Sequence, residues 1–170
     1  VLEAGMGGGV GRAMGLVLDY LDTSPLDGES ERRVGLALER GWREKIHLQT
    51  KVGTHPEKRG DYSGASTRWS VENSMKLLKT DYLDAVLIHD PSDIAVPLAP
   101  GNALDELLKM KEEGMIGHIG LGARPHDFHR KAIETGQIES VLTFLDYPLL
   151  DQAVPRTTPP RAPEPGHGIV

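Results

Sequence analysis

Short apolar runs and helical patterns alternate along the middle of this chain, and that alternation limits its fold more than any other feature. The apolar runs lie at residues 16–21, 46–51, 83–89, 115–121 and 138–145. The helical patterns lie between them, at residues 30–40, 70–78, 103–113 and 127–135. Alternating strands and helices are typical of βαβ units, so the sequence predicts an α/β fold with a parallel sheet. That sheet is either doubly wound or rolled into a (β/α)8 TIM-type barrel.

Local signals set the expected boundaries of these elements. Residues 83–89 (LDAVLIH) are nearly all apolar, as expected of a parallel strand covered on both faces. We expect Ser30 to cap the first helix and Gly41 to end it, because serine accepts backbone N–H bonds and glycine adopts left-handed backbone. We expect a polar loop at residues 53–66 and the start of a further strand at residues 168–170.

The two ends of the chain differ in composition from the middle. Six of the 20 glycines lie within residues 1–15, and six of the 12 prolines lie from Pro148 onward. We therefore expect irregular segments at 1–15 and 153–167 within a single domain, 1–170. The glycines near the N-terminus do not have the GxGxxG spacing of a dinucleotide site. Because the chain begins with Val1, we expect the native protein to be longer.

Charge and cysteine content exclude several classes of function. The net charge of −6 disfavours nucleic acid or an anionic membrane surface as the main partner, since both require a basic face. No cysteine is present, which excludes disulfides and thiolate chemistry. No apolar run approaches the roughly 18 residues of a membrane helix. We expect a cytoplasmic protein with a small-molecule partner.

Three predicted strands each end in an ionisable residue. Asp22 follows the first apolar run, Lys51 ends the second and His89 ends the third. In barrels and open α/β sheets the active site lies at the carboxyl ends of the strands, so these side chains form a candidate acid–base set. The alternative is structural: an Asp22–Lys51 ion pair beside a hydrogen-bonded His89.

Five segments resemble the aldo-keto reductases in order and spacing, and most nearly the branch of sugar and aldose dehydrogenases. They are residues 22–35, 48–53, 68–91, 115–122 and 145–152, of which 68–91 (RWSVENSMKLLKTDYLDAVLIHDP) is the most specific. The resemblance implies a (β/α)8 barrel that binds NADP(H), or NAD(H), and acts on aldehydes, ketones or sugars. A typical barrel needs about 250 residues. A chain of 170 residues is therefore expected to form an incomplete barrel that lacks its final strands and helices.

The resemblance also assigns roles to residues. The family's catalytic Asp, Lys and His correspond to Asp22, Lys51 and His89, whereas its catalytic tyrosine corresponds to Asp27. The tyrosine protonates the alkoxide that forms as hydride reaches the carbonyl carbon. We expect Asp27 near Lys51, ionised and unable to donate that proton, so reduction should be severely impaired unless His89 acts as the acid.

Cofactor binding is expected to be partial. In the family, much of the nicotinamide and phosphate contact comes from the seventh and eighth strands, and this chain ends where the seventh strand should begin. Gly122-Ala123, a candidate cofactor-binding pair, stands where the family often has Ser-Asn after its fifth strand. The unpaired sheet edges favour self-association. A catalytically inactive reductase-like binding module or a non-functional fragment is the alternative. A metal-dependent hydrolase on a similar barrel is a third reading, although His126 and His129 are expected to form a solvated helix face without a metal.

Overall fold

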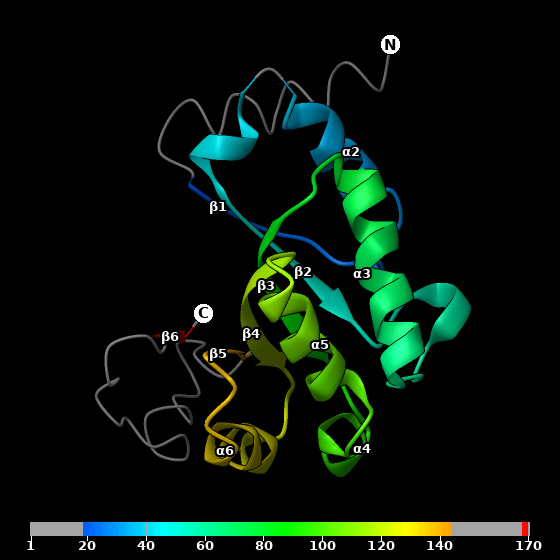
Figure 1. Ribbon diagram of the computed structural model, residues 1–170, viewed down its shortest axis with the longest axis vertical. Coiled ribbons are helices and arrows are strands. Elements are labelled where there is room, and N and C mark those ends of the chain that lie inside the picture. The colour runs from blue at the N-terminus through cyan, green and yellow to red at the C-terminus, as the bar shows by residue number, and fades with distance from the viewer. Residues whose placement is uncertain (1–18, 40, 144–167, 170) are drawn as a thin grey trace, which may run out of the picture.

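The computed structural model describes residues 19–39, 41–143 and 168–169, which form a parallel sheet with helices packed against it (Figure 1). The six described strands pair in chain order, β1-β2-β3-β4-β5-β6, and every pairing is parallel. Their bounds are β1 Tyr20–Asp22, β2 His47–Val52, β3 Leu83–His89, β4 Ile116–Gly122, β5 Ser140–Leu142 and β6 Gly168–Ile169. A doubly wound sheet reverses its strand order at a switch point. The observed order is instead that of a barrel, here incomplete.

Helices connect the strands and cover one face of the sheet. Their bounds are α2 Ser30–Ala37, α3 Gly64–Leu78, α4 Ala95–Leu98, α5 Ala103–Glu112 and α6 His126–Glu134, with 3-10 turns η1 Arg43–Lys45 and η2 Pro56–Lys58. Helix α3 packs between α2 and α5 (Figure 1). No described helix combines the length and the hydrophobicity that crossing a bilayer requires.

The two faces of the sheet carry different side chains. Leu48, Val86 and Ile119, from β2, β3 and β4, are fully buried in the hydrophobic core that the helices share. Side chains alternate between faces along a strand, so Gln49 and Lys51 lie on the opposite face. On β2 this alternation directs Leu48 and Val52 to the core under the helices, and Gln49 and Lys51 to the face where the candidate site lies.

Most predicted elements are present, and three of the predicted details are wrong. Gly41 does not end the first helix, because α2 ends at Ala37 with Leu38 as its C-cap. Ser30 does not cap α2: Glu29 occupies that position, and the Ser30 hydroxyl lies 2.8 Å from the Thr23 hydroxyl. Helix α3 begins at Gly64, inside the predicted loop, because the Ser63 hydroxyl accepts the Ser66 N–H and starts the helix early.

The strand expected at residues 168–170 is present as β6, which pairs with β5. The predicted irregular segments at 1–15 and 153–167 lie outside the described residues.

Candidate active site

The carboxyl ends of β1, β2 and β3 bring the predicted site residues to one cavity of about 460 Å³. Its lining includes all six residues singled out in the sequence: Asp22, Asp27, Lys51, His89, Gly122 and Ala123. The cavity volume falls within the range of about 300–1,000 Å³ typical of small-molecule sites. The lining also includes Ser24, Asp90, Arg124, Leu142 and Thr143, which the sequence did not single out.

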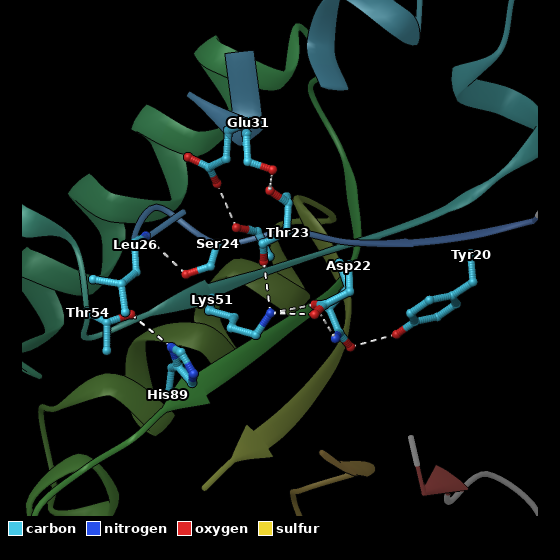
Figure 2. Close-up of polar contacts among 12 residues, drawn as sticks. Tyr20, Asp22, Thr23, Ser24, Leu26, Glu31, Lys51, Thr54 and His89 are labelled. Carbon is cyan, nitrogen blue, oxygen red and sulfur yellow. Dashed lines mark hydrogen bonds and ion pairs between the residues drawn. The ribbon is translucent and has the colours of Figure 1, made fainter. Parts of the chain in front are cut away.

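Lys51 and Asp22 form an ion pair at the base of this site (Figure 2). Lys51 Nζ donates to the two carboxylate oxygens of Asp22 at 2.7 and 2.6 Å, and to the backbone oxygen of Thr23 at 3.0 Å. An ammonium group has three N–H donors. All three are therefore directed at acceptors within the chain, and the charge of Lys51 is compensated although the residue is only 5% exposed.

A hydrogen-bonded chain behind Asp22 fixes its carboxylate. Tyr20 Oη donates to Gln49 Oε1 at 2.6 Å, and Gln49 Nε2 donates to Asp22 Oδ1 at 2.7 Å (Figure 2). Burial, together with the negative charges of Asp22 and Asp84, raises the pKa of Tyr20. Its phenol therefore stays protonated near neutral pH, as a hydrogen-bond donor must. The sequence offered one signal for Gln49, since it lies two residues before Lys51 and so on the same face of β2.

Two residues of the loop that follows β2 contact His89. Its Nδ1 lies 3.0 Å from Thr54 Oγ1, and its backbone oxygen accepts a 2.6 Å bond from Tyr62 Oη. Burial lowers the pKa of His89; the nearby Lys51 acts in the same direction, while Asp90 opposes both. The protein environment of His89 therefore favours the neutral ring.

Asp27 lies in the turn between β1 and α2. Its backbone N–H donates to Ser24 O at 3.0 Å, and its own carbonyl accepts from Ser30 N at 3.2 Å. Its exposed carboxylate lines the cavity, and its charge acts to raise the pKa of His89. Within the described part of the chain no ion pair joins it to Lys51, whose donors are already taken. Asp27 and Lys51 therefore line the same cavity, as expected, but do not form an ion pair with each other.

A buried carboxylate supports the turn that carries Asp27. Glu31 is 1% exposed, and its Oε1 accepts a 2.6 Å bond from Thr50 Oγ1 (Figure 2). This contact ties the start of α2 to β2, next to Lys51. No local sequence pattern points to it, because the two partners lie 19 residues apart.

Gly122 and Ala123 lie at the end of β4, beside His89. A Cβ atom at Gly122 would lie 3.4 Å from His89 Cδ2, so the strand end and the histidine ring are neighbours. The cavity has room for a nicotinamide ring. Neither residue offers a side-chain hydroxyl or amide, however, so the ring's carboxamide would find only backbone groups here. Gly122 and Ala123 are therefore small enough to adjoin a nicotinamide ring, but they lack the polar side chains that would hydrogen-bond its carboxamide.

The prediction that His126 and His129 form a solvated helix face is wrong for His129, which is 0% exposed. The rings of His126 and His129 stack with centroids 6.0 Å apart, and His129 Nε2 lies 2.7 Å from the backbone oxygen of Ala123. No group of three or more potential metal-ligating side chains occurs among the described residues.

These observations define the class of protein: an incomplete (β/α)8 barrel with a candidate acid–base set at the carboxyl ends of its strands. The sequence model of the Aldo/keto reductase family matches residues 10–164. The chain belongs to the aldo/keto reductase family.

Individual relatives agree with this membership. D-threo-aldose 1-dehydrogenase from Pseudomonas sp is 27% identical over 176 residues, covering 89% of this chain and 54% of that protein. A solved structure from Pseudomonas aeruginosa assigned to the aldo-keto reductases is 32% identical, with a TM-score of 0.81, covering 98% of this chain and 64% of that one. The aldo/keto reductase from Klebsiella pneumoniae, solved with NADP and acetate, has a TM-score of 0.69 at 24% identity, covering 87% and 53%. This chain thus spans about half the length of the dehydrogenase that it matches.

Proposed function

We propose that this chain carries the site of an NAD(P)H-dependent reductase for small aldehydes, ketones or sugars, and that Asp27 impairs the reduction. The supporting observation is the arrangement of Asp22, Lys51 and His89 around one cavity, with Asp27 on its lining. Family membership supports the oxidoreductase class. The similarity to an aldose dehydrogenase supports sugars or related carbonyl compounds as the substrate class.

Each residue has a defined role in this proposal. His89 donates a hydrogen bond to the substrate carbonyl oxygen and orients it. Lys51, ion-paired with Asp22, supplies positive potential where negative charge develops on that oxygen. A bound nicotinamide cofactor would supply the hydride. Asp27 occupies the position of the acid, but an ionised carboxylate cannot donate a proton and repels the developing alkoxide. We expect reduction to be slower by at least the roughly 10²–10⁴ attributed to general acid catalysis.

The cofactor would lie along the end of β4. Gly122 has no side chain beside His89, and Gly122 and Ala123 both line the cavity, so these two residues would adjoin the nicotinamide. NADP(H) is the first candidate, since a solved relative of this fold holds NADP. NAD(H) is the second.

The competing proposal is an inactive reductase-like binding module or non-functional fragment. Asp27 favours it, because the residue that donates the proton is replaced. The incomplete polar lining at Gly122 and Ala123 favours it as well.

Titration of the folded chain with NADPH separates the two proposals. We expect tryptophan fluorescence or calorimetry to detect saturable NADPH binding. We also expect Asp27→Tyr to reduce carbonyl substrates faster than the unmodified chain. The matched control is Asp81→Tyr, an exposed aspartate that precedes β3 at the opposite end of the strands. Binding without any gain for Asp27→Tyr would support the binding module. No binding at millimolar NADPH, with the fold verified by circular dichroism, would overturn the reductase proposal.

A further inference from the structure

The loop between β2 and α3 wraps around the backbone of His89. Tyr62, from the end of this loop, is 5% exposed and donates its hydroxyl to the His89 carbonyl at 2.6 Å. Its ring packs directly on Gly53, where a Cβ atom would lie 2.0 Å from Tyr62 Cε1. Gly53 also has a φ of +91°, a backbone conformation that suits glycine. The ring of Tyr62 is therefore fixed by its packing on Gly53, and its hydroxyl in turn holds the backbone of His89 at the end of β3.

Thr54 comes next in the loop and contacts the imidazole itself. It is 5% exposed, and its Oγ1 lies 3.0 Å from His89 Nδ1 (Figure 2). A threonine hydroxyl either donates to an unprotonated ring nitrogen or accepts from a protonated one. The role of Thr54 thus depends on which ring nitrogen of the neutral histidine carries the proton.

The charges on the other side of the ring decide between these two forms. His89 Nε2 lies 3.9 Å from Asp90 Oδ2, and both residues line the cavity. Asp90 follows His89 directly in the sequence and has a φ of +44°, a conformation that is uncommon outside glycine. Asp22 and Asp27 add negative charge from β1 and the turn after it, while Lys51 opposes them from β2. A proton on Nε2, beside the Asp90 carboxylate, is therefore favoured over a proton on Nδ1.

We propose that Thr54 is a positioning residue whose hydroxyl donates to Nδ1 of His89, leaving Nε2 protonated and directed to the cavity. Such a ring presents an N–H donor to a carbonyl oxygen without itself being charged. The catalytic role of this arrangement rests on the proposed reductase function. The tautomer of His89 and its contact with Thr54 do not depend on that function. Tyr62 acts only on the backbone: burial raises the pKa of its phenol to about 12, and it does not line the cavity, so it does not replace the missing tyrosine.

Nitrogen-15 NMR of the histidine side chains tests the tautomer in the chain without cofactor. Near pH 8 we expect His89 Nε2 to show the shift of a protonated ring nitrogen, and Nδ1 that of an unprotonated nitrogen accepting a hydrogen bond. The reverse assignment, with the proton on Nδ1, would overturn the proposal.

Substitutions at Thr54 test the contact. Thr54→Val keeps the shape and removes the hydroxyl, so the Nδ1 resonance should move toward that of a nitrogen without a hydrogen bond. Thr54→Ser should keep the wild-type resonance. The control is Thr67→Val in α3, a buried threonine whose hydroxyl has no partner among the described residues. An Nδ1 resonance unchanged in Thr54→Val, or displaced equally by Thr67→Val, would refute the contact.

Two features keep the test decisive. If Thr54→Val does not fold, the wild-type tautomer and the resonance of Thr54→Ser still decide the proposal. Failure of NADPH binding would overturn the proposed function and leave these resonances as expected, so the two outcomes are separate.

Discussion

Replacing Asp22 with asparagine removes the negative charge that faces Lys51 while preserving the shape of the site. The side chain of Lys51 is 6% exposed and that of Asp22 is 36% exposed. Removing one partner of a fully buried ion pair costs about 3–5 kcal/mol, and an exposed pair contributes about 0–1 kcal/mol. This pair lies between the two limits. The introduced amide would still offer one oxygen, and Thr23 O would still accept from Lys51.

We therefore expect Asp22→Asn to lower the free energy of unfolding by about 2 kcal/mol, because an uncompensated ammonium remains buried. For a chain of this length the melting temperature should fall by about 4–8 °C. Urea denaturation followed by the fluorescence of Trp42 and Trp69 measures the loss. The control is Asp127→Asn, which removes an exposed pair with Lys131 and should cost less than about 1 kcal/mol.

The two partners should also differ in their cost. Lys51→Met leaves a carboxylate that is partly solvated and still hydrogen-bonded to Gln49, whereas Asp22→Asn leaves a buried cation. Asp22→Asn should thus be the more destabilising change, and adding Lys51→Met to it should recover part of the loss. Equal losses for Asp22→Asn and Asp127→Asn would refute the reasoning, because the Asp22–Lys51 pair would then behave as an ordinary surface contact.

The surroundings of His89 and the open edges of the sheet give three further expected outcomes. Tyr62→Phe removes the bond to the His89 carbonyl and should cost about 1 kcal/mol in urea denaturation; no loss would mean that packing on Gly53 alone holds the ring. The pKa of His89 is lowered by folding, so the unfolded chain binds the extra proton first and stability should fall as pH drops below about 6.5. His89→Gln should flatten that slope, and an unchanged slope would contradict the assignment. Because β1 and β6 are the edge strands of the sheet that the described residues form, we predict reversible self-association; a monomer at high concentration in sedimentation velocity would argue against it.

The strands were predictable because each carries its signal within its own sequence. The apolar run at 83–89 coincides with β3, since a strand buried on both faces contains little else. The start of α3 was missed because its first two turns, Gly64 to Trp69, are mostly small or polar and the periodic apolar positions begin only at Val71. A single hydroxyl on Ser63 determines where that helix begins.

Some residues of the candidate site were predictable from the sequence and others were not. Asp22, Lys51 and His89 were found because strand ends converge at one edge of a parallel sheet, a rule that needs no knowledge of side-chain contacts. Thr54 was not found, because its partner lies 35 residues away and a threonine in a loop has no distinguishing pattern. Such a contact depends on how the loop after β2 folds over β3. The local sequence around Thr54 does not predict that arrangement.

The saturated donors of Lys51 limit what a tyrosine at position 27 can recover. Lys51 would lower the pKa of a phenol at that position most by directing an N–H to it, but the third N–H is engaged by Thr23 O at 3.0 Å. We therefore expect Asp27→Tyr to improve reduction only in part.

Absorbance titration at alkaline pH measures the new phenol by difference from the unmodified chain. A pKa clearly below the reference value of about 10 would show that Lys51 stabilises the phenolate by its charge or by a hydrogen bond. A pKa at or above 10 would show that the phenol gains no such stabilisation, and an incomplete recovery would then follow from the engagement of Lys51 with Asp22 and Thr23 O.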